Sequence, residues 1–289
     1  MPRVTVVMAT YNWSTVLPYS IGSALRQTFT DFEVLVVGDG CTDDSEAVVA
    51  AIGDPRVRWI NLPANSGHQS APNNEGLRQA RGEIIAYLGH DDLWLPHHLE
   101  ALTAALEAER ADVAYGIMAL VAPEGRHVWP TMPRPRLCSF APPSGMVHRR
   151  QVTEQIGGWR DYRALKITPE FDLYQRAHAA GCRFTFVPRL TGIKFPAAAR
   201  RGVYEIRPSH EQRTWLAKID AEPNFEARLL VKLIVEEQVP TGLTYRELVQ
   251  HFMRETTSRI RRRLFHPWTR GGTIDEIRRF KGLPENERR

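Results

Sequence analysis

Apolar, β-branched runs alternate with segments of helical periodicity along the first ninety residues, and this alternation leaves few possible architectures. Strand character is seen at residues 4–8, 32–37, 57–62 and 83–88, with helical spacing at 14–25, 43–52 and 74–80. The first helix is expected to begin at Ser14 as its N-cap. Strands that are apolar on both faces and separated by helices indicate a mostly parallel α/β sheet, Rossmann-like and flanked by helices.

The remaining chain is organised less regularly. We expect a helix after residue 92 with Pro96 near its start, and a loop or short edge strands across the proline-dense segment 123–143. A helix opens at Thr168-Pro169 and ends before Gly181, a strand follows at 183–187, and 225–265 is mainly helical. These patterns predict one domain over 1–215, in halves of about 1–95 and 96–215, and a helical, basic extension over 216–289.

The charge is concentrated at one end of the chain. The 289 residues carry a formal net charge of +5, yet 254–289 alone holds 11 basic and 5 acidic residues. This basic segment with apolar neighbours predicts either peripheral contact with an anionic membrane surface or a solvated helical face. Nucleic-acid binding is not expected, because the rest of the chain is slightly acidic and has no nucleic-acid motif. Without a signal-peptide pattern or a long apolar run, we expect a cytoplasmic protein.

Polar side chains follow three of the predicted strands at the points where those strands end. They are Thr10, Tyr11 and Asn12, then Asp39, then Asp91 and Asp92. In α/β sheets of this kind, ligands bind beyond the carboxyl ends of the strands. The sequence therefore predicts a binding crevice with acidic groups at this edge. Residues 38–43 are not a dinucleotide fingerprint, which argues against an NAD enzyme.

Four segments occur in an order typical of one family: 4–12, 31–45, 65–92 and 157–181. Together they resemble the family 2 glycosyltransferases with the GT-A fold, over roughly residues 4–188. The resemblance implies an inverting transfer of a sugar from a nucleotide-diphosphate donor to an acceptor hydroxyl, in bacterial polysaccharide or glycoconjugate synthesis. It makes 1–95 the nucleotide-binding half and 96–215 the acceptor half. The acceptor would be a saccharide, a lipid-linked sugar or another hydroxyl compound.

The resemblance also assigns the residues that bind the donor nucleotide. These are Thr10, Tyr11, Asn12, Asp39, Gly67, Asn73, His90 and Asp91. Asp39 would accept a hydrogen bond from N3–H of uracil or thymine, which favours a UDP- or dTDP-sugar. The alternative is a turn aspartate within Gly38-Asp39-Gly40.

A divalent cation, Mn²⁺ or Mg²⁺, is implied for the donor diphosphate. Asp91 is the candidate metal ligand, and Asp92 would support it or contact the sugar; the alternative is that both acids cap the following helix. Gly89 stands where the family commonly has an aspartate, which weakens the metal motif, and His90 offers an imidazole suited to Mn²⁺. Because Asn73 replaces a frequent basic residue, the candidate phosphate ligands are Lys194, Arg200 and Arg201.

Glu170 occupies the position of the family's catalytic base. Asp172 matches the second acid of the same motif, and the resemblance makes it a candidate for contact with the acceptor or the sugar. Acidic residues after Thr168-Pro169 are equally typical of an ordinary helix start. Trp94 and Trp159 are candidates for stacking on the sugar or acceptor, or else for the core.

Two other functions remain open. Gly89 is compatible with a catalytically weak nucleotide-binding module. A sugar nucleotidyltransferase has a similar sheet, but its glycine-rich phosphate loop is replaced here by residues 9–12. The sequence does not indicate an oligomeric state.

Overall fold

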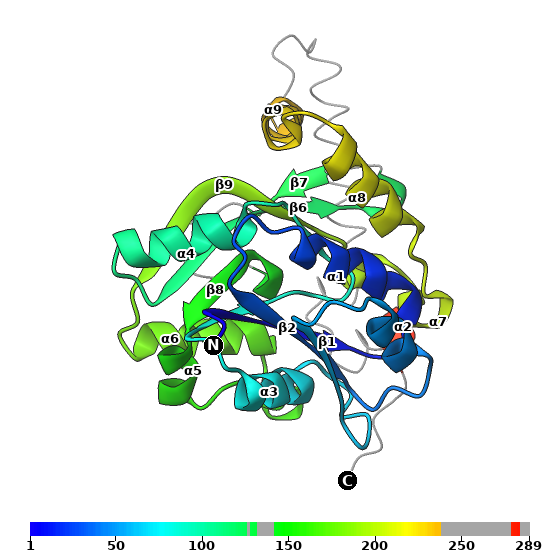
Figure 1. Cartoon of the computed structure of the whole chain (residues 1–289), viewed down its shortest axis with the longest axis vertical. Helices are drawn as coiled ribbons and strands as arrows, with labels where there is room; N and C mark the ends of the chain where they lie inside the picture. The colour runs from blue at the N-terminus through cyan, green and yellow to red at the C-terminus, as the bar shows by residue number, and fades with distance from the viewer. Residues whose placement is uncertain (126–127, 132–141, 238–278, 284–289) are drawn as a thin grey trace.

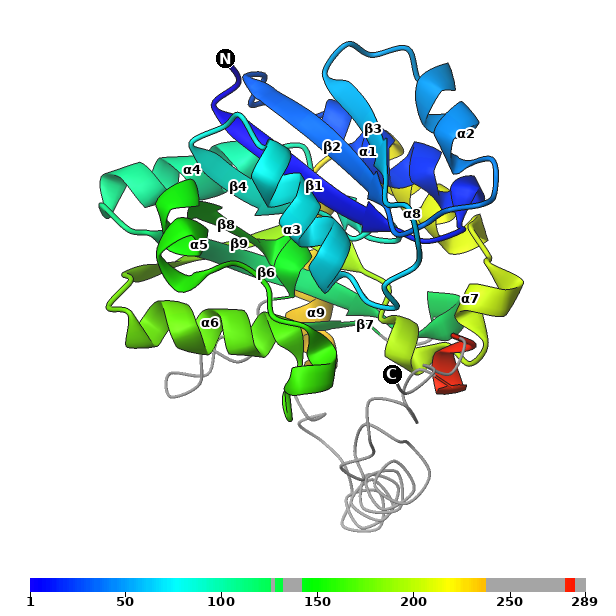
Figure 2. The same ribbon diagram turned by 90° about the horizontal axis from the view of Figure 1, so that it is seen from below.

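The computed structural model describes residues 1–125, 128–131, 142–237 and 279–283. One mixed sheet runs through the molecule, and helices cover both of its faces (Figure 1 and Figure 2). Its strand order is β3-β2-β1-β4-β8-β6-β9-β5, with β7 paired to β6. The strands are β1 (Val4–Thr10), β2 (Phe32–Gly38), β3 (Val57–Asn61), β4 (Ile84–Tyr87), β5 (Leu93–Trp94), β6 (Val113–Val121), β7 (Val128–Pro130), β8 (Met146–Arg149) and β9 (Phe184–Lys194).

The first half of the sheet is parallel, as the sequence predicts. Strand β1 lies between β2 and β4, and Val7 is aligned with Leu35 on one side and Tyr87 on the other. Strand β3 extends the parallel set beyond β2. Because these strands run in one direction, their carboxyl ends and the polar residues after them share one edge.

The second half is mixed, whereas the sequence predicts a mostly parallel sheet. Strand β8 runs antiparallel between β4 and β6, while β6 and β9 are parallel. Leu93 and Trp94, expected at a helix start, instead form β5, antiparallel to β9. The helix begins only at His98, two residues after Pro96.

Most helices connect these strands, and the last three follow β9. They are α1 (Leu17–Leu25), α2 (Ser45–Ala51), α3 (Ser70–Gln79), α4 (His98–Ala108), α5 (Arg150–Ile156), α6 (Pro169–Ala179), α7 (Val203–Ile206), α8 (His210–Ala221) and α9 (Phe225–Glu237). Alternate β1 residues serve the two faces: Val6 packs in a core with α1 and α4, and Val7 in a core with α5 and α6. Ser14 is not the N-cap of α1. It lies in a 3₁₀ turn, and its N–H donates to the Asp43 carboxylate at 3.1 Å.

The described part of the predicted extension packs against the sheet. Leu216 of α8 and Phe225 of α9 join a core that includes Ile117 and Ile193 of β6 and β9. The division at residue 216 stays a prediction. Within the described residues, no helix has the length and apolarity needed to cross a bilayer. Most of the basic segment 254–289 and part of the proline-dense segment lie outside the described residues.

Candidate functional site

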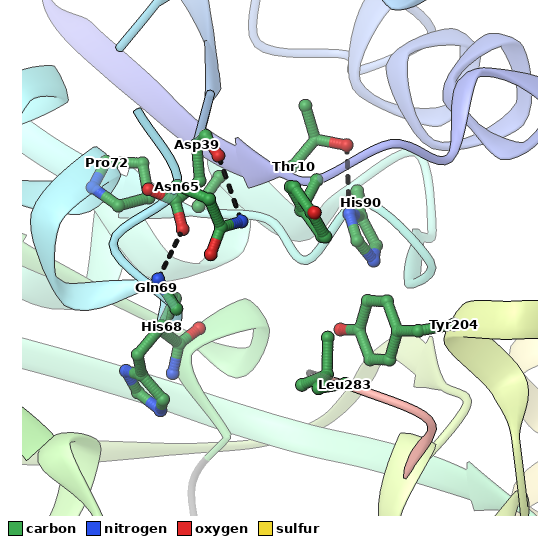
Figure 3. Close-up of a pocket in the computed structure, with 12 residues that line it drawn as sticks. Thr10, Asp39, Asn65, His68, Gln69, Pro72, His90, Tyr204 and Leu283 are labelled. Atoms are coloured by element: carbon green, nitrogen blue, oxygen red, sulfur yellow. Dashed lines mark hydrogen bonds between the residues drawn. The ribbon is translucent and has the colours of Figure 1, made fainter. Parts of the chain in front are cut away.

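A pocket lies beyond the carboxyl ends of β1 and β2, where the strand-end residues were expected to meet. It has a volume of about 410 Å³ and is open to solvent. Figure 3 shows the side chains around it. The lining residues are Ala9, Thr10, Tyr11, Asp39, Asn65, Gly67, His68, Gln69, Pro72, His90, Tyr204 and Leu283. The predicted donor residues Thr10, Tyr11, Asp39, Gly67 and His90 therefore share one cavity.

Asp39 is held rigidly in the wall of this pocket. Its carboxylate accepts the backbone N–H of Ser66 at 2.9 Å and of Gly67 at 3.1 Å, one to each oxygen. Its own N–H donates to the Thr10 carbonyl at 2.8 Å, and Asn65 Nδ2 donates to its carbonyl at 3.1 Å. Gly67 takes a positive φ of 88°, which suits glycine. These contacts fix the direction of a buried carboxylate at the end of β2.

Of the polar residues at the end of β1 and in the loop after it, some line the pocket and others bind a neighbouring loop. Thr10 Oγ1 lies 3.0 Å from His90 Nδ1, and both residues line the cavity. Asn12 instead joins two loops, because its Oδ1 accepts the N–H of Thr42 at 2.7 Å and its Nδ2 donates to Thr42 Oγ1 at 3.2 Å. Asn12 is not among the lining residues, so its contact with a nucleotide stays a prediction.

Asp91 and Asp92 follow β4 but have different surroundings. Asp92 is fully buried and accepts hydrogen bonds from Ser144 Oγ at 2.5 Å, Lys194 Nζ at 3.0 Å and the Phe195 N–H at 3.1 Å. The Asp91 carboxylate accepts no hydrogen bond from any residue that the structure describes. Asp91 is thus the acid that is available to a ligand.

Gly89 has a structural role in this turn. Its N–H donates to Ser144 Oγ at 2.9 Å, and a Cβ at this position would lie 2.8 Å from Asp92 Oδ2. A side chain at residue 89 would therefore displace Asp92 from its contacts. The departure from the family's aspartate fits the way Asp92 is bound here.

The charges around the turn compensate one another. Burial raises the pKa of Asp91, and the Asp92 carboxylate raises it further. Burial lowers the pKa of His90 despite these two carboxylates. Burial alone would lower the pKa of Lys194, but the charges of Asp92, Asp91 and Glu170 outweigh it and raise the pKa, so the ammonium stays protonated.

The described residues contain no group of three side chains that would hold a metal ion by themselves. A single carboxylate such as that of Asp91 fits Mg²⁺, which proteins often bind through one or two carboxylates. Water and substrate phosphates supply the other ligands of such an ion.

Glu170 lies in the first turn of α6, partly exposed. Its charge is the smallest of the contributions that raise the pKa of Lys194, so Glu170 lies within electrostatic reach of that ammonium. Asp172, two residues on, is bound instead by Arg176 Nε at 2.7 Å and Arg160 Nη1 at 3.4 Å. These two ion pairs hold the Asp172 carboxylate against Arg176 of the same helix and Arg160 before it. A sugar contact by Asp172 stays a prediction.

Several other candidates are engaged in the fold. Trp94 is buried, donates from Nε1 to the Ser144 carbonyl at 2.6 Å and stacks on His98. Trp159 packs edge-on against Tyr87 in the core behind β4. Neither tryptophan lines the pocket, and both pack in the protein core in this structure. Stacking of either ring on a sugar or acceptor stays a prediction. Asn73 is likewise buried in α3 and outside the pocket lining.

The two predicted arginines differ in their accessibility. Arg200 is 8% exposed and forms a double hydrogen bond with Glu211, both at 2.9 Å, so it would have to leave this partner to reach a phosphate. Arg201 is exposed.

Several residues of the site were not predicted from the sequence. Asn65 and His68 follow the strand predicted at 57–62, so the same rule of polar residues after strands would have found them. Ser144, Tyr204 and Leu283 carry no such signal, because they reach the site from segments distant in the sequence.

Comparisons with known proteins identify the family of the chain. Residues 5–165 match the family model described as Glycosyl transferase family 2. The succinoglycan biosynthesis protein ExoO of Rhizobium meliloti is 40% identical over 126 residues, which are 44% of this chain and 36% of that protein. In Escherichia coli, WfgD, a UDP-Glc:alpha-D-GlcNAc-diphosphoundecaprenol beta-1,3-glucosyltransferase, is 30% identical over 113 residues, 39% of this chain and 44% of that protein. The chain thus spans less than half of the length of these two relatives.

Solved glycosyltransferase structures have the same fold. Staphylococcus aureus TarS 1-349 in complex with UDP-GlcNAc aligns with a TM-score of 0.58 at 20% identity, over 81% of this chain and 72% of that one. The mannosyltransferase PcManGT of Pyrobaculum calidifontis, in complex with GDP-Man and Mn²⁺, aligns with a TM-score of 0.55 at 18% identity, over 93% and 84%. Because the family model spans more than half of its length, the chain belongs to glycosyl transferase family 2, and its fold is of the GT-A type.

Proposed function

We propose that this protein is an inverting glycosyltransferase that moves a sugar from a UDP- or dTDP-sugar to an acceptor hydroxyl. The observation that carries the proposal is the fixed Asp39 carboxylate in a pocket shared with Thr10, Gly67 and His90. A carboxylate held in this direction can accept the N3–H of uracil or thymine with a remaining lone pair, and it would meet a ring-nitrogen lone pair on a base that has no N–H there.

The diphosphate would lie between the pocket and the Asp91 turn. Asp91 would share a divalent cation with the phosphates, and this cation would neutralise charge on the leaving group. Lys194 supports the same function, because its protonated ammonium lies beside the two acids and has further N–H donors besides the one given to Asp92. Arg201 is an additional candidate for the phosphates.

Glu170 is the proposed general base. Its carboxylate would take the proton of the acceptor hydroxyl while the hydroxyl oxygen attacks the anomeric carbon and the bond to the diphosphate breaks. The electron pair of that bond leaves with the nucleoside diphosphate. Attack opposite the leaving group inverts the anomeric centre.

The acceptor is proposed from the relatives. ExoO is a succinoglycan biosynthesis protein, and the name of WfgD specifies a lipid-linked saccharide acceptor. A growing bacterial polysaccharide or a lipid-linked sugar is the acceptor class that we propose, with a cytoplasmic location and peripheral membrane contact through the basic segment.

Calorimetric titration with UDP, dTDP, GDP and ADP, each with Mn²⁺ and with a chelator, tests the donor site. We expect a pyrimidine diphosphate to bind selectively, about tenfold more tightly with Mn²⁺, and Asp91→Ala to remove that gain. The exposed Asp44→Ala is the matched control and should bind like the wild type.

Each other outcome contradicts a named part of the proposal. Binding that is equal with and without the chelator excludes the cation. Failure of every nucleotide to bind excludes the donor site. Stable binding without sugar transfer would favour the binding module, and release of pyrophosphate from a nucleoside triphosphate would favour a nucleotidyltransferase.

A further inference from the structure

The donor pocket has two chemically different walls. One is polar and is built from the strand ends and the segment before α3, including Asp39, Asn65 and Gln69. The other is formed by the ring of Tyr204 and the side chain of Leu283, which lie across the space from Asp39 and Asn65 (Figure 3). A slot with hydrogen-bonding groups on one side and an aromatic ring and a leucine side chain on the other suits a planar, polar-edged ligand.

Leu283 reaches the pocket from a segment far along the chain. The described residues 279–283, drawn in red, lie against α7 (Figure 2). The Gly202 N–H donates to the Phe280 carbonyl at 3.0 Å, and the Gly282 N–H closes a turn onto the Arg279 carbonyl at 3.1 Å. Gly282 has a φ of +77°, and a Cβ there would lie 2.8 Å from Glu205 Cγ. Direct packing on α7 thus fixes the position of Leu283.

Helix α7 is anchored in turn to the loop after β1. Val203 is buried against Trp13 and Val16, and Tyr204 lies edge-on to Trp13 with ring centroids 5.6 Å apart. The Arg207 carbonyl accepts Thr15 Oγ1 at 3.4 Å, and Arg207 Nε donates to the Tyr204 carbonyl at 2.8 Å. The Tyr204 ring is therefore oriented before any ligand arrives.

The position of this wall identifies the part of the ligand that it would contact. Asp39 and Gly67 line the same pocket, whereas Asp91, Asp92 and Lys194 do not. The wall thus faces the part of the pocket proposed for the nucleoside. Its Tyr204 ring also reaches the border of the Asp91 turn, because it lies 5.9 Å from the ring of His90. Both Tyr204 and Leu283 also lie outside residues 5–165, so the family match does not account for them.

We propose that residues 279–283, together with Tyr204, form the nucleoside-contacting wall of the donor pocket. This inference rests on the proposed function, because it takes a nucleoside diphosphate as the ligand. The segment contributes directly to binding through the apolar contact of Leu283, and α7 holds it in place.

Titration of wild type and variants with UDP, dTDP, GDP and ADP, and with the matching monophosphates, tests the wall. Leu283→Ala should weaken binding of the preferred base about fivefold, by the same factor for mono- and diphosphate, because the contact is with the nucleoside. Leu283→Met should bind nearly as the wild type. Gly282→Ala should weaken binding too, because its Cβ would push the segment off Glu205.

Matched controls separate this effect from a general disturbance. Gly181→Ala introduces the same kind of backbone strain, at a φ of +83°, where no other atom lies within 4 Å of the new Cβ. Ile206→Ala removes an apolar side chain that is 72% exposed on the same helix. Both should bind nucleotides like the wild type, and thermal unfolding checks that every variant is folded.

The outcomes distinguish this proposal from the one on which it rests. If the wild type binds a nucleotide and Leu283→Ala binds it equally or more tightly, the wall is wrong and the proposed function stands. A loss confined to diphosphates would also overturn it. If the wild type binds no nucleotide, the proposed function fails and the nucleoside assignment of the wall fails with it.

Discussion

Asp91 and Asp92 illustrate how two identical neighbours acquire different roles. Asp92 is enclosed by Ser144, Lys194 and the Phe195 N–H, whereas the carboxylate of Asp91 has no hydrogen-bond donor among the described residues. The sequence predicted an acidic pair here and favoured Asp91 as the ligand from the family pattern. It could not predict that Asp92 would be occupied, because Ser144 and Lys194 come from distant segments.

The Asp92–Lys194 ion pair gives a stability prediction. Lys194→Met should lower the free energy of unfolding by roughly 3 kcal/mol, because it leaves the fully buried Asp92 carboxylate without a counter-charge. Urea denaturation measures this. Adding Asp92→Asn to the variant should recover part of the loss, since the uncompensated charge is then gone. Equal stability of Lys194→Met and wild type would contradict a coupled pair.

Glu170 can be tested by removing only its charge and basicity. Glu170→Gln should slow release of nucleoside diphosphate from the preferred sugar nucleotide at least about 100-fold, with nucleotide affinity unchanged, because general-base catalysis is lost. Glu46→Gln is the matched control, since Glu46 also lies in the first turn of a helix and is exposed. Near-normal turnover by Glu170→Gln would exclude it as the base.

At the scale of elements, close contact between α3 and β1 sets the position of the segment that bears Gly67. Gly76 lies where α3 crosses β1, and a Cβ there would overlap Val7 Cγ1. Gly76→Ala should therefore destabilise the protein by about 1–3 kcal/mol through overpacking. Urea denaturation measures the change.

Gly22→Ala in α1 is the control for helix propensity. Its Cβ would meet the flexible end of Arg26 at 3.3 Å, so the substitution should be neutral or stabilising by up to about 1 kcal/mol. Equal effects at the two glycines would contradict the packing explanation.

The sequence predicted the elements of the parallel half well and those of the mixed half poorly. Strands β1, β2 and β4 are apolar runs bounded by turn residues, so local pattern identifies them. Strand β3 is a shorter, partly exposed strand that includes Arg58. Strand β6 (Val113–Val121) was missed, because a continuous apolar run has no periodicity to separate strand from helix. Strand β9 extends to Lys194, beyond the predicted end at 187, since pairing with β6 and β5 continues past the local signal.

At the scale of the whole molecule, the residues of the site that directly follow strands could be predicted from the sequence. The residues that reach the site from distant segments could not. Thr10, Asp39 and Gly67 meet because the parallel strands bring their ends to one edge. Tyr204 and Leu283 reach the same cavity only because α7 and residues 279–283 pack together. Tertiary contacts between such distant segments have no signature in a single sequence.

The strand order also has a consequence for the newly made protein. Strand β4 is complete at residue 87, but its second neighbour is β8, which is synthesised much later. Until residues 146–149 leave the ribosome, the backbone N–H and C=O groups along one side of β4 have no partner strand, and another nascent chain could pair with them. Pairing of the antiparallel β8 with β4 therefore removes an exposed strand edge through which nascent chains could associate. That edge exists because the parallel half of the sheet is synthesised first.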